Sequence, residues 1–266
     1  MLSSHCSRVS VDLQIDNNQL TGPIPTELTG MESLEILYFS DNLLSGTIPF
    51  KELSTMSSLS KFVLLLTQVD GFHLSSLNST LPTFVFLMLE TLSFSSPSVY
   101  IYPDFLFLQN NLFTGSLTTE IGNFYNLTAL WLENNGSLEG SIPSEIGLLK
   151  TIQSLNLAYN KFNNQLPKEL GLLTNLIELG LHNNTFSGTI ITEFGLLTSL
   201  EALDLASNRF TGPIPSELGM LSNLLYLDLS GNIQLGGGTN EIPVELEVLC
   251  QNNFTTCFLP LQVDMV

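Results

Sequence analysis

The chain repeats itself about every 24 residues. Residues 203–215 (LDLASNRFTGPIP) recur in similar form at 179–190, 155–162 and 13–25. One asparagine keeps its place in these copies at spacings of 24 or 25 residues, first as Asn18 and Asn42, then as Asn111, Asn135, Asn160, Asn184, Asn208 and Asn232. A fixed period in this range predicts a solenoid, in which each repeat packs only on its two neighbours.

Each position of the repeat has a physical role. In the Leu-x-Leu pair, Leu203 and Leu205 share one face of a short strand and enter the core, while Asp204 points the other way. The repeated asparagine carries a donor and an acceptor on a short side chain, so we expect it to satisfy backbone groups in a buried ladder. A glycine such as Gly212 follows where the chain turns back. Leucines then recur at spacing three, which predicts a 3₁₀ or helical turn on the convex side.

These residues resemble the plant-type leucine-rich repeat, whose pattern is LxxLxLxxNxLxGxIPxxLGxLxxL, over about residues 11–60 and 105–245. The resemblance implies an α/β solenoid: a right-handed superhelix with a parallel concave sheet, a second short sheet, and short 3₁₀ or helical turns on the convex side. It also implies extracellular recognition, as in receptor-like kinase and receptor-like protein ectodomains, polygalacturonase-inhibiting proteins and related algal and protist proteins. We therefore expect a non-catalytic module that binds a protein, peptide or glycan on its concave face. The alternatives are an inhibitor of an extracellular hydrolase and an intracellular assembly scaffold.

The repeat pattern divides the chain into three parts. Residues 1–10 read as the remnant of an N-terminal cap, 11–245 as the solenoid, and 246–266 as a C-terminal cap and tail. Inside the solenoid, residues 62–71 still fit the repeat with Thr67 in the asparagine position, whereas about 72–104 form an irregular insertion. That insertion is either a functional island on the concave face, a degenerate repeat with a loop, or a gene-model error.

Whether the cysteines are oxidised and the sequons glycosylated depends on the compartment in which the protein is located. The resemblance implies a cap disulfide between Cys250 and Cys257, which would indicate an oxidising compartment; two free buried thiols are the alternative, and Cys6 is left over. Asn135 also starts a sequon, but it occupies the ladder position and should stay bare. In a secreted chain we expect glycosylation at the four other sequons: Asn78, Asn126, Asn183 and Asn253.

Charge and hydropathy limit the partners. Seven Lys and Arg against 25 Asp and Glu give a net charge of −18, which disfavours nucleic acid and anionic membrane surfaces. The longest apolar run, residues 84–89, is far shorter than the ~20 residues of a membrane-spanning helix. No secretory signal is visible at the start. We expect an extracellular or cell-surface protein acting with a membrane-bound co-receptor, with a cytoplasmic location as the alternative.

The sequence carries no catalytic, cofactor-binding or metal-binding motif. The three histidines, His5, His73 and His182, lie at no metal-ligand spacing, and the chain contains no HExxH, CxxC, G-x-S-x-G or P-loop motif. We therefore do not expect an enzyme.

The ligand hypothesis comes from the residues that alternate outward from the strands. The residue between the two core positions is, in successive repeats, Gln14, Tyr38, Phe107, Trp131, Asn156, Gly180, Asp204 and Asp228. The next outward position gives Asp16, Ser40, Gln109, Glu133, Ala158, His182, Ala206 and Ser230. We expect these side chains to be solvated and the acidic ones to have ordinary pKa values. Rigid exposed aromatic rings are typical of binding hot spots. The candidate ligand-binding residues are Tyr38, Phe107, Trp131, Glu133, Tyr159 and His182, with Asp204 and Asp228 orienting a basic group; chance placement is the alternative.

Overall fold

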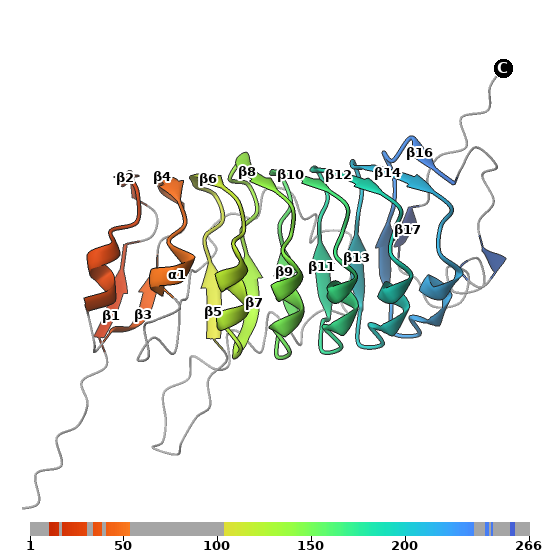
Figure 1. Ribbon diagram of the computed structural model, residues 1–266, viewed down its shortest axis with the longest axis horizontal. Helices are drawn as coiled ribbons and strands as arrows, with labels where there is room; N and C mark the ends of the chain where they lie inside the picture. The colour runs from red at the N-terminus through yellow and green to blue at the C-terminus, as the bar shows by residue number, and fades with distance from the viewer. Residues whose placement is uncertain are drawn as a thin grey trace, which may run out of the picture.

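The protein is a stack of repeats with three elements each, seen in a computed structural model that describes residues 11–15, 18–30, 34–38, 41–53, 104–236, 243–244, 246 and 256–258. One strand of each repeat joins a parallel sheet, which we call the concave sheet. Its seven strands are β5 (Asp104–Phe107), β7 (Leu127–Trp131), β9 (Ser154–Asn156), β11 (Glu178–Gly180), β13 (Ala202–Asp204), β15 (Tyr226–Asp228) and β17 (Thr256–Phe258). At the N-terminal end β1 (Val11–Gln14) pairs with β3 (Leu34–Tyr38). The expected parallel sheet is confirmed (Figure 1).

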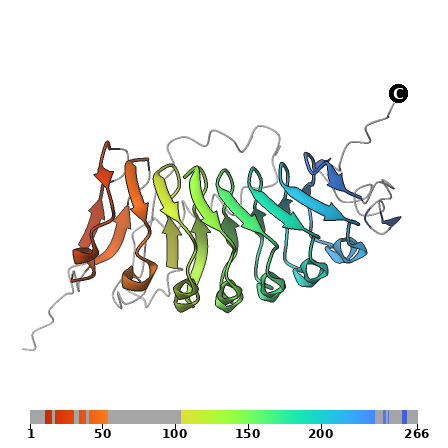
Figure 2. The same cartoon turned by 45° about the horizontal axis from the view of Figure 1, so that its top comes forward.

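A second strand of each repeat joins a separate eight-stranded sheet. Its strands are β2 (Thr21–Gly22), β4 (Leu43–Thr47), β6 (Leu112–Gly115), β8 (Ser137–Gly140), β10 (Lys161–Asn164), β12 (Thr185–Gly188), β14 (Arg209–Gly212) and β16 (Gln234–Leu235). Figure 2 shows these strands in front of the concave-sheet strands, with the helical turns below them.

The third element is a short helical turn on the convex side. Six are 3₁₀ helices: η1 (Thr26–Gly30), η2 (Thr119–Asn123), η3 (Ser144–Leu148), η4 (Lys168–Leu172), η5 (Thr192–Leu196) and η6 (Ser216–Met220). The seventh, α1 (Phe50–Leu53), is α-helical. The turns stack closely because a glycine follows the buried core residue: a Cβ on Gly171 would lie 2.5 Å from the Cβ of Glu193 in the next repeat.

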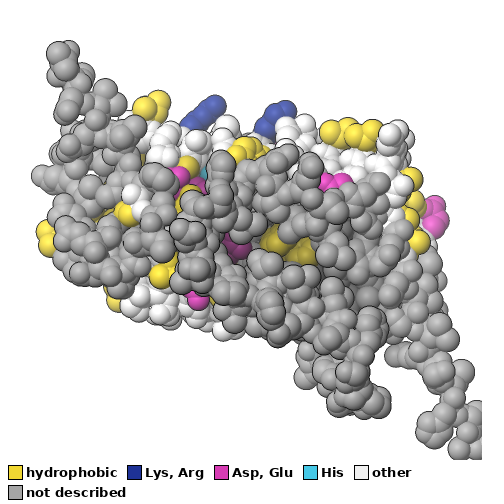
Figure 3. Space-filling view, turned by 180° about the vertical axis from the view of Figure 1, so that it is seen from behind, with side chains coloured by type: hydrophobic (Ala, Val, Ile, Leu, Met, Phe, Trp, Pro, Cys, Tyr) yellow, Lys and Arg dark blue, Asp and Glu magenta, His cyan; other side chains and the backbone are white. Residues whose placement is uncertain are grey.

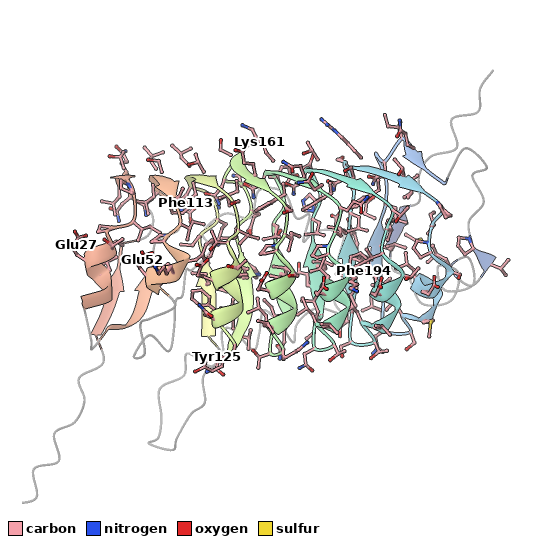
Figure 4. The ribbon with its side chains drawn as sticks, viewed as in Figure 1. Glu27, Glu52, Phe113, Tyr125, Lys161 and Phe194 are labelled. Atoms are coloured by element: carbon pink, nitrogen blue, oxygen red, sulfur yellow. The ribbon has the colours of Figure 1, made fainter. Side chains whose placement is uncertain are left out.

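The core fills the space between the two sheets and the helical turns. From β5 to β15, both leucines of each Leu-x-Leu pair are buried, as Leu203 and Leu205 are, at 0% exposure. Phe162, Phe186 and Phe210 stack in successive repeats with ring centroids 6.1 and 6.4 Å apart. Phe113 and Phe194 lie within this interior (Figure 4). The apolar period of the sequence therefore becomes one continuous core.

The asparagine ladder forms as expected. Asn184 Nδ2 donates to the Leu157 carbonyl at 2.9 Å, and its Oδ1 accepts from the Phe162 N–H at 3.0 Å. Asn208 makes the equivalent bonds one repeat later. Asn160 departs from the pattern: Nδ2 donates to the Leu132 carbonyl at 2.8 Å, but within the described part of the chain its buried Oδ1 accepts no hydrogen bond. Asn160 follows Asn135 by 25 residues, and the extra residue displaces the donor that the other copies supply.

The repeat expected at residues 62–71 lies outside the described residues and stays a prediction. β4 pairs directly with β6, and the Leu44 N–H donates to Asn111 Oδ1 at 3.2 Å. Among the described residues, the ladder thus passes directly from Asn42 to Asn111. Thr67 and the irregular insertion up to residue 103 lie outside the described residues, and Asp104, assigned to that insertion, is the first residue of β5.

The C-terminal end continues the concave sheet further than the repeat pattern indicates. β17 pairs in parallel with β15, although its sequence lacks the asparagine and glycine of a repeat. Cys257, in the middle of β17, is disulfide-bonded. Cys250 lies outside the described residues, as do Cys6 and the expected N-terminal cap remnant, so the identity of the bonded partner stays a prediction.

Candidate ligand-binding face

The outward side chains of the concave sheet form three rows. Two are those derived from the sequence. The third, at the first residue of each short strand, comprises Ser154, Glu178, Ala202 and Tyr226, which are in register across β9, β11, β13 and β15. The alternation predicted from the sequence starts at the residue between the two leucines and therefore does not include this row. Counting two residues back from the residue between the leucines would have identified this third row.

An aromatic pair begins the described part of this face. The rings of Phe107 and Trp131 stack with centroids 4.4 Å apart and an interplanar angle of 22°. Trp131 Nε1 donates to Ser154 Oγ at 2.7 Å, and Ser154 Oγ lies 3.2 Å from Glu178 Oε2, to which it donates. A hydrogen-bonded chain therefore crosses β7, β9 and β11 and fixes the orientation of the only tryptophan.

A polar cluster occupies the other half of the face. His182 Nδ1 lies 3.2 Å from Asp204 Oδ2. Tyr226 Oη lies 3.4 Å from Asp228 Oδ2 and 3.5 Å from Asp204 Oδ2, so the hydroxyl donates to one of the two carboxyls. The Tyr159 ring meets the His182 ring edge-on at 5.0 Å. We call these five side chains the His182 cluster.

Backbone geometry holds the members of this cluster in place. Asp204 Oδ1 accepts from the Ala206 N–H at 3.0 Å, and Asp228 Oδ1 accepts from the Ser230 N–H at 2.8 Å, so each carboxyl caps the turn that follows its strand. Tyr159 has a φ of 53°, in the left-handed region that few non-glycine residues adopt. The positive φ that lets the chain turn at Tyr159 therefore also sets the direction of the Tyr159 side chain.

The expectation that these outward residues are solvated is wrong for several of them. Phe107 is 2% exposed, His182 6% and Asp204 7%. Strands in a sheet lie about 4.8 Å apart, so bulky side chains at equivalent positions contact each other, as the Phe107–Trp131 and His182–Asp204 pairs do. Trp131, Glu133 and Asp228 are partly buried, and Tyr159 is exposed. Tyr38 lies in β3, but its side chain is outside what the structure describes.

Burial also changes the protonation of the polar residues, contrary to the ordinary pKa values expected. Loss of solvation raises the pKa of Glu133 to about 8 and that of Asp204 to about 7. It raises the pKa of Glu178 as well, against the hydrogen bond from Ser154. The same cause lowers the pKa of His182 to about 4. At weakly acidic pH, the protonated carboxyls can therefore donate hydrogen bonds as well as accept them.

Seen from behind, acidic side chains show among hydrophobic ones, and Lys and Arg side chains lie along the upper edge (Figure 3). Lys161 and Arg209 project from the second sheet and are exposed. Within the described ranges, no group of His, Cys, Asp and Glu side chains is placed to hold a metal ion. The described helices are all too short and too polar to cross a membrane.

The predicted glycosylation sites fall into two groups. Asn126 and Asn183 are exposed and can accept a glycan, whereas Asn78 and Asn253 lie outside the described residues. Asn135 is 4% exposed, and its side chain bonds to the backbone of Phe113, Leu108 and Leu132, as expected of a ladder residue.

Comparison with known proteins agrees with this architecture. A family model described as Leucine Rich Repeat matches residues 33–51, 151–173, 175–197 and 199–221. Receptor-like protein 35 of Arabidopsis thaliana is 32% identical over 165 residues, which cover 62% of this chain and 15% of that protein. The chain thus spans a small part of this relative's length.

Two solved receptor structures share the fold over most of the chain. The plant peptide hormone receptor RGFR1, solved in complex with RGF2, superposes with a TM-score of 0.63 at 29% identity and covers 88% of this chain and 34% of that one. PEPR1–AtPEP1 gives a TM-score of 0.60 at 29% identity, over 93% of this chain and 35% of that one.

Proposed function

Because this chain belongs to the plant-type leucine-rich-repeat proteins, we propose that it binds a protein, peptide or glycan ligand on its concave face and catalyses no reaction. The ligand would contact Trp131 and the His182 cluster, with Tyr38 and Glu133 extending the site and the buried Phe107 supporting the Trp131 ring. The observation that carries the proposal is the fixed orientation of Trp131 on a rigid sheet beside a row of hydrogen-bonding side chains.

The geometry of Trp131 suits a binding anchor. Its ring is held from one side by Phe107 and at its N–H by Ser154, and it remains partly exposed. An aromatic side chain already held in one orientation loses little conformational entropy when a ligand packs against it. Trp and Tyr are enriched among the residues that dominate binding energy. Trp131 therefore offers contact area at low entropic cost.

The polar residues would supply direction and selectivity. Asp204 and Asp228 lie one repeat apart and share the Tyr226 hydroxyl, so a basic or donor group of the ligand can replace that hydroxyl. A buried carboxyl that meets a positive charge ionises more readily, because the opposite charge offsets the loss of solvation. Glycan hydroxyls could use the same oxygens through hydrogen bonds alone.

The relatives support a receptor-like role. One structural neighbour is a plant peptide hormone receptor, RGFR1, in complex with RGF2, and another is the receptor kinase HAESA in complex with the peptide hormone IDA and the co-receptor SERK1. We extend this to the present chain as an extracellular or cell-surface recognition module that works with a membrane-bound co-receptor. The disulfide at Cys257 supports an oxidising compartment.

The same face would also serve an inhibitor of an extracellular hydrolase. An inhibitor and a receptor differ in their partner, so capture of a hydrolase with loss of its activity favours the inhibitor. A cytoplasmic scaffold is favoured if the native protein is found with Cys257 reduced.

The test uses Trp131 as both anchor and reporter. Extracellular fluid and peptide fractions are passed over the immobilised chain, and captured species are titrated against wild-type and Trp131→Ala protein. We expect quenching or a shift of the single tryptophan emission, and a loss of affinity of about 2 kcal/mol, or roughly thirtyfold, in the variant.

A matched control is Tyr125→Ala, which removes an exposed aromatic ring between η2 and β7, at the lower edge of the stack in Figure 4. Its affinity should equal that of wild type. If Trp131→Ala binds the ligand normally and the wild-type emission is unchanged at saturation, the concave-face proposal is wrong. Circular dichroism of both variants checks that each remains folded.

A further inference from the structure

The convex side carries a row of exposed apolar side chains. The last residue of each of four consecutive 3₁₀ helices, η3 to η6, is Leu148, Leu172, Leu196 and Met220, at 55, 49, 54 and 64% exposure. Single exposed leucines are common on protein surfaces, but a row of large apolar side chains is not. The equivalent residue of η2 is Asn123, so the row begins at η3. We call it the convex apolar row.

The row is continuous from repeat to repeat. A Cβ on Gly147 would lie 3.3 Å from Leu172 Cδ1, so the Leu172 side chain leans over the preceding repeat, next to Leu148. Leu148 leans over Gly122 in the same way. Leu148 and Leu172 therefore bridge the boundaries between neighbouring repeats.

An acidic row runs beside the apolar one. Glu145, Glu169, Glu193 and Glu217 are the second residues of the same helices, three positions before the apolar residues. In a 3₁₀ helix, side chains at i and i+3 eclipse each other, so each glutamate lies on the same side of its helix as the apolar side chain.

Hydroxyl groups orient most of these carboxylates. The preceding residue donates to Glu Oε2 in three of the four helices: Ser144 at 3.2 Å, Thr192 at 3.3 Å and Ser216 at 3.4 Å. In η4 that position is Lys168, and Lys150 donates to the Leu172 carbonyl at 3.3 Å. Four carboxylates thus outnumber two ammonium groups along the row.

We propose that the convex apolar row, with its acidic row, is a docking surface for a partner protein that presents apolar side chains flanked by Lys or Arg. An amphipathic basic helix laid along the four helical turns would bury its apolar side chains on the apolar row and pair its charges with the glutamates. This surface is separate from the concave face, so it leaves the ligand site free.

Charge excludes the simpler occupants. A second copy of this chain would bring its own acidic row close to this one, on molecules that each carry −18. An anionic membrane surface is repelled for the same reason. The occupant that lowers the electrostatic energy and covers the apolar row is a basic protein surface.

The test measures binding of a fluorescein-labelled synthetic peptide with leucines on one helical face and lysines on the other, by fluorescence anisotropy. The double variant Leu172→Ser/Leu196→Ser removes apolar area without changing net charge. We expect its affinity to fall about tenfold or more, as for the loss of buried apolar anchors. The matched control, Leu112→Ser/Ile233→Ser, changes two exposed apolar residues beside the second sheet and should bind like wild type.

A second pair of variants tests the charge. Glu169→Gln/Glu193→Gln should weaken binding and reduce its salt dependence more than Glu139→Gln/Glu201→Gln, which removes two charges outside the helical turns. Equal affinities of each test variant and its control variant would show that the peptide binds the acidic protein without a defined site, and would overturn the proposal.

The proposal would also be overturned if the wild type self-associates in sedimentation and Leu172→Ser/Leu196→Ser does not. Thermal unfolding of each variant confirms that it is folded, and Met220→Ser provides an independent variant of the row.

Discussion

His182 Nδ1 lies 3.2 Å from Asp204 Oδ2 across neighbouring strands of the concave sheet, and both side chains are almost inaccessible to solvent. Burial lowers the pKa of the imidazole to about 4 and raises that of the carboxyl to about 7, because each charged form loses solvation. Between these values both groups are neutral, and the proton resides on Asp204. At weakly acidic pH the pair therefore consists of two neutral groups in close contact.

The free energy of unfolding should fall as pH rises from about 6.5 to 8. Glu133 and Asp204 have folded-state pKa values of about 8 and about 7, above the ordinary 4.5 and 3.8, so the folded chain keeps protons that the unfolded chain has lost. His182 has the opposite sign, but its effect ends near its ordinary pKa of 6.5. The slope can reach about 1.4 kcal/mol per pH unit for each retained proton.

Urea denaturation across this pH range measures that slope. Glu133→Gln should flatten it, whereas the exposed control Glu139→Gln should leave it unchanged. A constant free energy of unfolding in wild type would mean that these carboxyls are ionised in the folded state.

Asn184→Ala should destabilise the fold by roughly 1–3 kcal/mol, because it leaves the buried Phe162 N–H without its acceptor and removes one of the donors to the Leu157 carbonyl. The exposed neighbour Lys161→Ala should change stability by less than about 0.5 kcal/mol. Chemical denaturation compares the two. Equal effects would contradict the ladder role of Asn184.

Gly171→Ala should cost about 1–3 kcal/mol by overpacking. The new methyl group would lie 2.5 Å from Glu193 Cβ and 2.7 Å from the Glu193 carbonyl oxygen, and the backbone there cannot move without shifting η5. Calorimetric unfolding gives the loss. If the variant is as stable as wild type, the helical turns stack more loosely than the structure has them.

Cys257→Ser should loosen the C-terminal end before the centre. Repeats contact only their neighbours, so amide exchange should accelerate in β17 and β15 while β9 stays protected. If the bonded partner is Cys250, the short loop predicts a loss of about 2.5 kcal/mol; a bond to Cys6 would close most of the chain and cost more. Peptide mapping of the unreduced protein identifies the partner, and uniform exchange along the stack would argue against end fraying.

The periodic parts of the fold could be predicted because each position has one physical reason. Leu203, Asn184 and Gly212 sit where the pattern places them, since a buried apolar contact, a paired backbone group and a turn each tolerate few residue types. Strand β17 could not be predicted in this way, because it extends the concave sheet without the asparagine and glycine that mark a repeat.

The candidate site was harder to predict, because the alternation of residues along a strand shows on which side of the sheet a side chain lies but not how deeply it is buried. The sequence showed that His182 and Asp204 leave the strands on the same side, yet it could not show that they contact each other and exclude water. Glu178 and Tyr226 were missed because strands of three residues leave little pattern from which to fix the first outward position.

The unpaired oxygen of Asn160 has a mechanical consequence. If the two ends of the stack are pulled apart, as happens to a surface protein whose ligand is anchored elsewhere, the load passes through every seam in series. The seam at Asn160 lacks a hydrogen bond that its neighbours have, so it should rupture first. Each repeat that then unravels releases roughly 80 Å of chain, at about 3.5 Å per residue. In a single-molecule force trace, the first unfolding event should come from the middle of the stack. The disulfide formed by Cys257 should delay the unfolding of the C-terminal end.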